Sequence, residues 1–424
     1  MDGKIPVKKN WIYLTVLIYP LWSFYLSIKH FRDSQAKNLF WLFCIFLGMI
    51  HIYFPDDIID VYDGYRYART LIELHNEPVS LENFTASFYK DGEFLDIYQP
   101  VLTYILSIIT GNPRWLFLIF AIVFGFFYSR NIWLILEKFP KKTGIVLLLF
   151  TLYYALICPV WEINGVRMWT AFHVFAFGAL HYLYYNEKPK LIWCFSSILI
   201  HLSFFIPVTI LIAYLLMPKS LKYYLAFYVV SIFVNEVGVE QIRLFFISIS
   251  PSFLTSSINA YVNEDYSQKL IEVQSSYNFY IEWSRMIVKW LVAVVLCTAC
   301  IWGEKIIKTR KEMLHLMCFT LFLCALSNLL SLVIILSGSR FIALSHFFAF
   351  FSMILFYIHY LQSDYRQKGV SILFRTTAIL LILPIIVVLR MGCDYYGFSL
   401  LLNPLAVLFV EDNQPVIQFV KSFL

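Results

Sequence analysis

Residues 141–167 have the sequence KKTGIVLLLFTLYYALICPVWEINGVR. Two lysines are followed by an uncharged, mainly apolar stretch (143–160) and then by Glu162 and Arg167. A helix needs about 20 apolar residues to cross the hydrocarbon core of a bilayer. This stretch therefore predicts a membrane span between a basic side and a side that carries a lone arginine.

The rest of the chain repeats this arrangement. Of 424 residues, 60% are hydrophobic and 14% are charged, against about 25% charged in a soluble domain. Spans in lipid must satisfy their own backbone hydrogen bonds, and the roughly ten-residue alternation of a β-barrel is absent. We predict an all-α polytopic transmembrane bundle, one integral membrane domain over 1–424, with about 12 spans (range 11–14) near 11–28, 39–54, 115–136, 143–160, 167–185, 190–203, 204–217, 220–236, 284–302, 313–335, 340–361 and 370–390.

The gaps between these spans are sorted by charge. Six alternate gaps hold 16 of the 33 basic residues, which places them in the cytoplasm by the positive-inside rule. The net charge of +6 follows from these loops and does not indicate nucleic acid. The basic gaps are Lys29/Arg32/Lys37, Lys138/Lys141/Lys142, Lys188/Lys190, Lys219/Lys222, Lys305/Lys308/Arg310/Lys311 and Arg366/Lys368.

Two expected outer loops are large. Residues 55–114 carry ten acids against four lysines and arginines, and 237–283 are rich in Tyr, Ser and Asn. The short apolar stretch 97–110 is expected as an interfacial or re-entrant helix, because counting it as a span would invert every later loop. We divide 190–217 at His201, and we expect the tail from Phe398 to be a broken apolar helix on the outer face.

The few arginines on the outer side are the candidate functional residues. Arg167 is expected at the N-terminus of a span, where free N–H groups and the helix dipole favour an anion. Arg340 follows Ser337-Gly338-Ser339, which we expect to be a flexible turn. A guanidinium can bind phosphate oxygens in a fork, although an interfacial arginine can also simply extend toward lipid headgroups.

Other polar residues join them as candidates. In a helix that starts at Asp63, this acid shares a face with Arg66 and Tyr67, as a functional pair or as a local surface ion pair. Arg285 and Lys289 share a face of the ninth span, and a charge inside a membrane usually faces a cavity. His201 and His346, near outer span ends, are candidate bases or packed polar residues.

Three local patterns resemble the EpsG-type branch of the Wzy O-antigen, capsule and exopolysaccharide repeat-unit polymerases. They are Asp63-Gly-Tyr-Arg66-Tyr67 after the second span, Asn164-Gly-Val-Arg167 at the start of a mid-chain span with His201-Leu-Ser downstream, and Arg340 at the start of a late span. Length and span layout also fit over most of the chain. Met168-Trp169 departs from the family, in which Gln or a small residue often follows the arginine.

The resemblance implies an inverting, metal-independent glycosyl transfer at the periplasmic face of the bacterial inner membrane. An undecaprenyl-diphosphate-linked glycan passes to a hydroxyl of a fresh lipid-linked repeat unit, without cofactors, and a chain-length regulator is a further candidate partner. Preorganised arginines would stabilise the leaving diphosphate. We expect Asp63, Glu162 and His201 as candidate bases, Arg167, Arg340, Arg66 and Arg285 at the diphosphate, and Tyr67, Asn164, Lys289 and His346 at the substrate.

Two alternatives stay open. Asp56 and Asp57 could hold a metal in another kind of lipid-phosphate-sugar glycosyltransferase. A transporter or flippase for lipid-linked oligosaccharides is the non-enzymatic alternative, although such proteins often carry inverted repeats and charges at mid-membrane.

Overall fold

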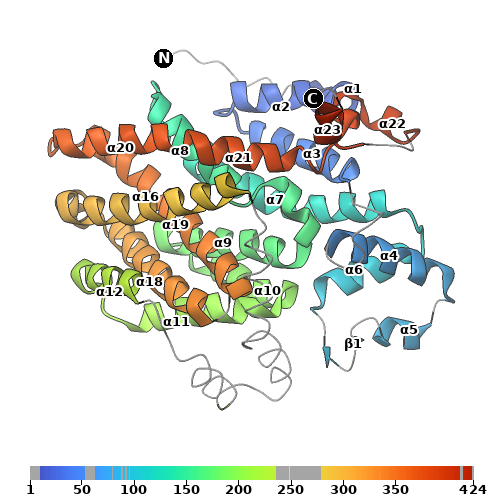
Figure 1. The fold of residues 1–424 in the computed structure, drawn as a ribbon, viewed down its shortest axis with the longest axis horizontal. Coiled ribbons are helices and arrows are strands. Elements are labelled where there is room, and N and C mark those ends of the chain that lie inside the picture. Colours follow the sequence, from blue (N-terminus) through green and yellow to red (C-terminus); the bar gives the residue numbers. More distant parts are fainter. Residues whose placement is uncertain are drawn as a thin grey trace.

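The computed structural model describes residues 10–52, 63–78, 80–86, 89–90, 93–94, 96–234, 248, 278–333, 335–410 and 414–422 (Figure 1). Within them the chain is helical, apart from a two-residue antiparallel pair of strands, β1 (Tyr89–Lys90) and β2 (Glu93–Phe94). The expected all-α class is confirmed. The total of about twelve spans stays a prediction, because by length and composition six helices of the described part are candidate membrane spans: Pro113–Leu136, Ile145–Tyr185, Phe279–Trp302, Lys311–Leu332, Arg340–Gln362 and Lys368–Gly392.

The N-terminal segment is interrupted where one span was expected. After η1 (Asn10–Tyr13), helix α1 (Leu14–Ile18) ends and α2 (Pro20–Lys29) begins beyond an extended Tyr19. Proline disfavours helical conformation at the residue before it and can itself start a helix, which explains the break. Helix α3 (Ala36–Met49) follows and packs along α7 (Pro113–Leu136).

Close packing of α3 on α7 depends on two glycines. A Cβ on Gly48 would overlap that of Ala121 and lie 2.6 Å from the Phe117 carbonyl oxygen. A Cβ on Gly125 would lie 2.7 Å from that of Cys44. Small residues let helix backbones approach where lipid supplies no hydrophobic driving force for association.

The middle of the chain forms the part of the bundle that carries the site. Helix α8 (Ile145–Leu156) is followed by the 3-10 turn η2 (Val160–Gly165) and by α9 (Val166–Tyr185), which ends at a left-handed Asn186. The expected division at His201 is present, between α10 (Leu191–Ile200) and η4 (Leu202–Phe204). η3 (Lys188–Lys190) precedes α10, and α11 (Phe205–Leu216) and α12 (Leu221–Phe233) follow η4.

The C-terminal half adds six further helices to the described part of the chain. They are α16 (Phe279–Trp302), α17 (Glu304–Thr309), α18 (Lys311–Val333), α19 (Ile335–Gln362), α20 (Lys368–Leu380) and α21 (Ile382–Gly392). The flexible turn expected at 337–340 is wrong, because α18 ends at Val333 and α19 already begins at Ile335. Arg340 therefore lies in the second turn of α19 rather than at its start. Most of the expected loop 237–283 lies outside the described residues, and its last five residues belong to α16.

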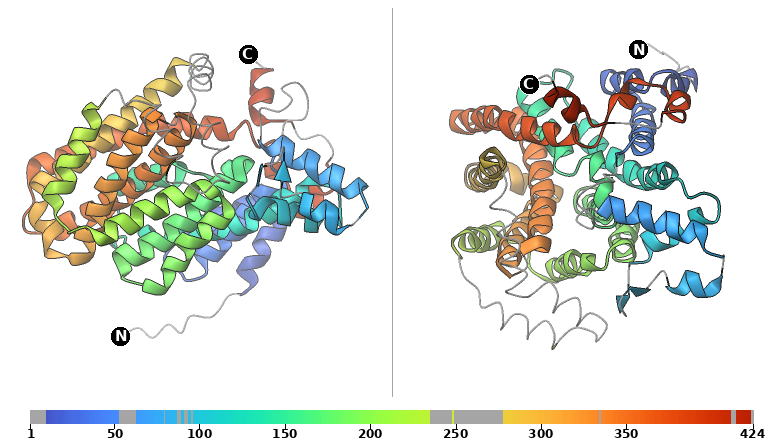
Figure 2. Two further views of the ribbon diagram at one scale, coloured as in Figure 1. Left: turned by 90° about the horizontal axis from the view of Figure 1, so that it is seen from below. Right: turned by 45° about the vertical axis from the view of Figure 1, so that its right-hand side comes forward.

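A layer of short helices covers one end of the bundle. It consists of α4 (Asp63–Asn76), α5 (Leu81–Ala86), the β1–β2 pair and α6 (Tyr98–Ser107), and it lies at the same end in Figures 1 and 2. Helix α6 packs on α4, as suits the short helix expected at 97–110.

The tail is broken into η6 (Phe398–Leu401), α22 (Pro404–Val407) and α23 (Val416–Lys421). Arg114, at the start of α7, donates hydrogen bonds to the carbonyl groups of Val407 (3.0 Å) and Val410. These bonds hold the tail against the end of the bundle where α7 begins.

The basic gaps meet one another at the opposite end. Helix α9 has 20 residues, and its C-terminal Tyr184 and Tyr185 lie at this basic end. At 1.5 Å per residue, about 30 Å separate this basic end from the N-terminus of α9. The contacts here are Arg32 to the Pro140 carbonyl (2.7 Å), Lys37 to Glu137 (3.4 Å), Lys138 over the Tyr185 ring (4.9 Å), Tyr184 to His359 (3.2 Å) and Lys305 over the Tyr365 ring (5.2 Å).

Candidate functional site

The site is built around the first turn of α9. This helix begins at Val166, so Arg167 occupies its second position, as expected from the sequence. Helix α4 approaches this turn closely, since a Cβ on Gly64 would overlap the Asn164 side chain. The Asn164-Gly165 pair thus lies between α9 and the layer of short helices.

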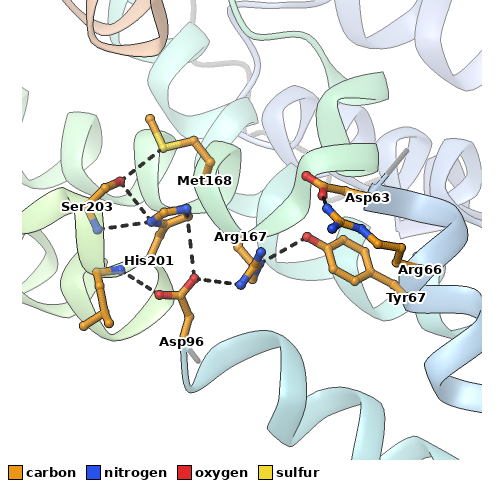
Figure 3. A network of polar contacts seen from close by, with 9 residues as sticks. Asp63, Arg66, Tyr67, Asp96, Arg167, Met168, His201 and Ser203 are labelled. Atoms are coloured by element: carbon orange, nitrogen blue, oxygen red, sulfur yellow. Dashed lines mark hydrogen bonds and ion pairs between the residues drawn. The ribbon is translucent and has the colours of Figure 1, made fainter. Parts of the chain in front are cut away.

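The Arg167 guanidinium joins two segments of that layer. Its Nη1 lies 3.3 Å from Asp96 Oδ2, and its Nε donates a hydrogen bond of 3.2 Å to the Tyr67 hydroxyl (Figure 3). The Asp96 side chain is 6% exposed, whereas that of Arg167 is 25% exposed. The cation is therefore reachable from solvent, and its carboxylate partner is not.

Asp96 is the residue that the sequence analysis missed. Its Oδ1 accepts a 2.8 Å hydrogen bond from the backbone N–H of Leu202, and its Oδ2 lies 4.0 Å from His201 Nε2. The sequence places Asp96 among ten acids of one loop. Its distinguishing signal is that it is the last acid before the apolar stretch 97–110.

His201 is held in one orientation by the turn that follows it. The backbone N–H of Ser203 donates to His201 Nδ1 at 3.1 Å, and Ser203 Oγ lies 2.9 Å from the same nitrogen. A nitrogen that accepts a backbone N–H carries a lone pair, so in the neutral ring the proton is on Nε2. The Nε2–H bond then faces Asp96, as Figure 3 shows.

Helix α4 contributes the expected acid, arginine and tyrosine from one face. Asp63 and Arg66 form an ion pair one turn apart. Burial raises the pKa of Tyr67 to about 12, with the Arg167 guanidinium acting in the opposite direction. The hydroxyl of Tyr67 therefore stays protonated near neutral pH and is a neutral acceptor for Arg167.

Glu162 and Arg340 complete the charged cluster. Glu162 lies in η2, and the Arg340 charge acts on both Glu162 and His201. Arg340 makes no hydrogen bond or ion pair within the described part of the chain. It is a half-buried cation of α19 whose charge reaches Glu162, just before α9.

The remaining candidates lie elsewhere. Lys289 and His346 line a separate pocket between α12, α16, α18 and α19, with Asn328 and Ser345 among its walls and room for about one water molecule. Arg285 is exposed on α16, one turn before Lys289. Neither Lys289 nor His346 shares a hydrogen bond or ion pair with Arg167 in the described residues. The cluster around Arg167 and this pocket are therefore separate sites.

The cluster brings three guanidinium groups (Arg66, Arg167, Arg340) together with three carboxylates (Asp63, Asp96, Glu162). Such a set can bind an anion if a carboxylate gives way, and it offers carboxylate bases beside the anion. Among the described residues, no group of three or more His, Cys, Asp or Glu is placed to hold a metal ion. Asp56 and Asp57 lie outside these residues.

Comparison with known proteins gives no relative. No family model, no curated protein and no solved structure matches the chain.

Proposed function

We propose that this protein is a membrane glycosyltransferase of the repeat-unit polymerase kind. The observation that carries the proposal is the meeting of Arg167 and Arg340 with Asp63, Asp96 and His201 at one end of the bundle. That end lies opposite the basic gaps, about 30 Å away along α9. The positive-inside rule then assigns the cluster to the outer, periplasmic face of a bacterial inner membrane, in a chain of about twelve spans.

The proposed reaction is a direct displacement at a sugar carbon. The acceptor hydroxyl of a fresh lipid-linked repeat attacks the anomeric carbon of the growing glycan and loses its proton to a base. The bond from that carbon to the diphosphate oxygen breaks, and undecaprenyl diphosphate leaves with the electron pair. Inversion of the anomeric centre follows from a single displacement.

The charges of the cluster suit this chemistry. Negative charge gathers on the leaving diphosphate, and preorganised guanidinium groups in a site of low dielectric constant stabilise it most in the transition state. Arg167 supports this role through its exposed edge and helix N-terminal position, and Arg340 through having no carboxylate at contact distance in the described residues. Oligosaccharide on undecaprenyl diphosphate is donor and acceptor, with a chain-length regulator as a further partner.

The test is glycan analysis of a strain that lacks this protein. We expect single repeats on the lipid carrier in the outer leaflet, and a ladder restored by the wild type. Arg167→Ala and Arg340→Ala should each abolish the ladder at normal protein level, since the loss of one such donor costs about 10²–10³ in rate. Lysine in place of either arginine should restore the ladder poorly, because an ammonium group lacks the two parallel N–H donors of a guanidinium. Arg375→Ala, on the exposed side of α20, is the matched control and should restore the ladder.

Other outcomes separate the alternatives. An unchanged ladder in the null strain rejects the polymerase for that glycan. Repeats trapped in the inner leaflet would indicate a flippase. Activity that is lost with a chelator and with Asp57→Asn, but kept in Arg167→Ala, would indicate a metal-dependent glycosyltransferase.

A further inference from the structure

We propose that Asp96 is an internal counter-anion that occupies Arg167 in the free protein and becomes the proton acceptor once a diphosphate takes the guanidinium over. This inference rests on the proposed function and assigns a base that the sequence analysis did not consider. It has four parts: an exchangeable ion pair, a carboxylate that is fixed independently of that pair, the exclusion of the neighbouring groups, and a balanced proton transfer.

The ion pair between Arg167 and Asp96 is long, and it leaves part of the guanidinium without a partner in the described residues. Its 3.3 Å separation exceeds the roughly 2.7–2.9 Å of a strong charge-assisted hydrogen bond. Nε is committed to Tyr67 and Nη1 to Asp96, while Nη2 makes no hydrogen bond to any residue that the structure describes. An arginine has five N–H donors, so a phosphate oxygen can bind the free edge before the carboxylate contact is given up.

The Asp96 carboxylate is held by the backbone independently of the arginine. The Leu202 N–H, at 2.8 Å, belongs to the first residue of η4 and fixes Asp96 to the backbone. His201 Nε2, at 4.0 Å, lies on the same side as Arg167. Asp96 therefore stays in place when Arg167 turns to a ligand. A ligand on the guanidinium removes the Arg167 contact from Asp96 Oδ2, so this oxygen becomes free to accept a hydrogen bond from the acceptor hydroxyl, while Oδ1 stays on the Leu202 N–H.

Two neighbouring groups, His201 and Asp63, are less suited to accept the proton. His201 Nδ1 accepts from Ser203, and Nε2 carries its proton toward Asp96, so neither nitrogen has a free lone pair. Asp63 is paired with Arg66 on its own helix, where no bound ligand need break the pair.

The proton balance closes within the site. The acceptor O–H proton moves to an Asp96 carboxylate oxygen as the oxygen–carbon bond forms at the sugar. The carbon–oxygen bond to the diphosphate breaks, and the electron pair leaves on the diphosphate that Arg167 holds. After the lipid diphosphate departs, the proton passes from Asp96 to water and Arg167 returns to the carboxylate.

The test uses the full-length protein in lipid nanodiscs and two probes, inorganic pyrophosphate and a short polyprenyl diphosphate. Asp96→Asn keeps an oxygen for the Leu202 N–H but removes the competing charge. We expect it to bind the polyprenyl diphosphate on the order of tenfold more tightly than the wild type, the value of one hydrogen bond to a charged group. Turnover of lipid-linked repeats should fall on the order of 100-fold or more, the usual share of a general base.

The controls separate this role from a structural one. Glu73→Gln removes an acid that is paired with Arg69 on the exposed side of α4, and it should change neither binding nor turnover. Asp96→Ala should also bind more tightly, which guards against an effect specific to asparagine. In an Arg167→Ala background, Asp96→Asn should no longer tighten binding.

The outcomes are distinguishable. Unchanged or weaker probe binding by both Asp96 variants, with wild-type binding intact, overturns the counter-anion. Tighter binding with full turnover overturns the base. If the wild type binds neither probe, the diphosphate site itself fails, and the proposed function fails with it.

Discussion

Replacement of Gly48 by alanine tests the close contact between α3 and α7. The new Cβ would overlap that of Ala121 and lie 2.6 Å from the Phe117 carbonyl oxygen, where ordinary contact begins at 3.4 Å. Neither a backbone carbonyl nor a Cβ can rotate away, so the helices must separate by at least about 0.8 Å to relieve the carbonyl contact, and further to relieve the closer contact with Ala121. Overpacking of this kind costs about 1–3 kcal/mol.

The assay is thermal unfolding of the purified protein in detergent, followed by tryptophan fluorescence. Gly48→Ala should lower the midpoint clearly, while Gly144→Ala, with no atom within 4 Å of the new Cβ, should leave it unchanged. Adding Ala121→Gly to Gly48→Ala should recover part of the loss, because it removes one of the two clashes. Equal midpoints for Gly48→Ala, Gly144→Ala and the wild type would refute the packing of α3 on α7.

Three further results follow from the contacts of Arg114 and Tyr67. Arg114→Ala removes two hydrogen bonds to the tail carbonyls and should expose a C-terminal tag to protease at concentrations that spare the wild type. Tyr67→Phe removes the oxygen that accepts from Arg167 Nε, and turnover in a lipid-linked repeat assay should fall about tenfold, as for one hydrogen bond to a charged group. A raised tyrosine pKa favours folding at low pH, so the stability of the wild type relative to Tyr67→Phe should be full below pH 10 and decline as the pH rises toward about 12. A stability difference that grows over this interval would contradict the burial of Tyr67.

The helices were largely predictable because the length of an apolar stretch is a local property of the sequence. Several helices begin or end near a proline, a lysine pair or, for α9, Asn186. The ends of these helices agree with the ends of the expected spans to within a few residues. Two features depend on more than local pattern. The Tyr19–Pro20 break interrupts a stretch that is apolar enough to be continuous, and the start of α19 at Ile335 ignores a Ser-Gly-Ser sequence that favours a turn in isolation.

The sequence pointed to Arg167, Arg340 and two of the carboxylates of the cluster, but it missed Asp96, and it also named Arg285, which lies elsewhere. Arg167 stood out because it lies on the side where basic residues are scarce. Asp96 had no such contrast, since its loop is acidic throughout. Its importance comes from the contacts of α6 with α9 and α10, near which Asp96 meets Leu202 and His201. Contacts between distant segments of this kind leave no periodic trace in one sequence.

The residues of the cluster are synthesised at different times, because they lie far apart in the sequence. Asp63, Asp96 and Arg167 emerge early, and the nascent chain can neutralise both acids with arginines already made. Glu162 has to wait for Arg340, which arrives with α19 near the end of translation. A chain that stalls before α19 keeps this acid beside the start of α9 without the Arg340 charge that acts on it. The cluster is therefore complete only in a chain that has been made through α19, because Arg340 is the last of its members to be synthesised.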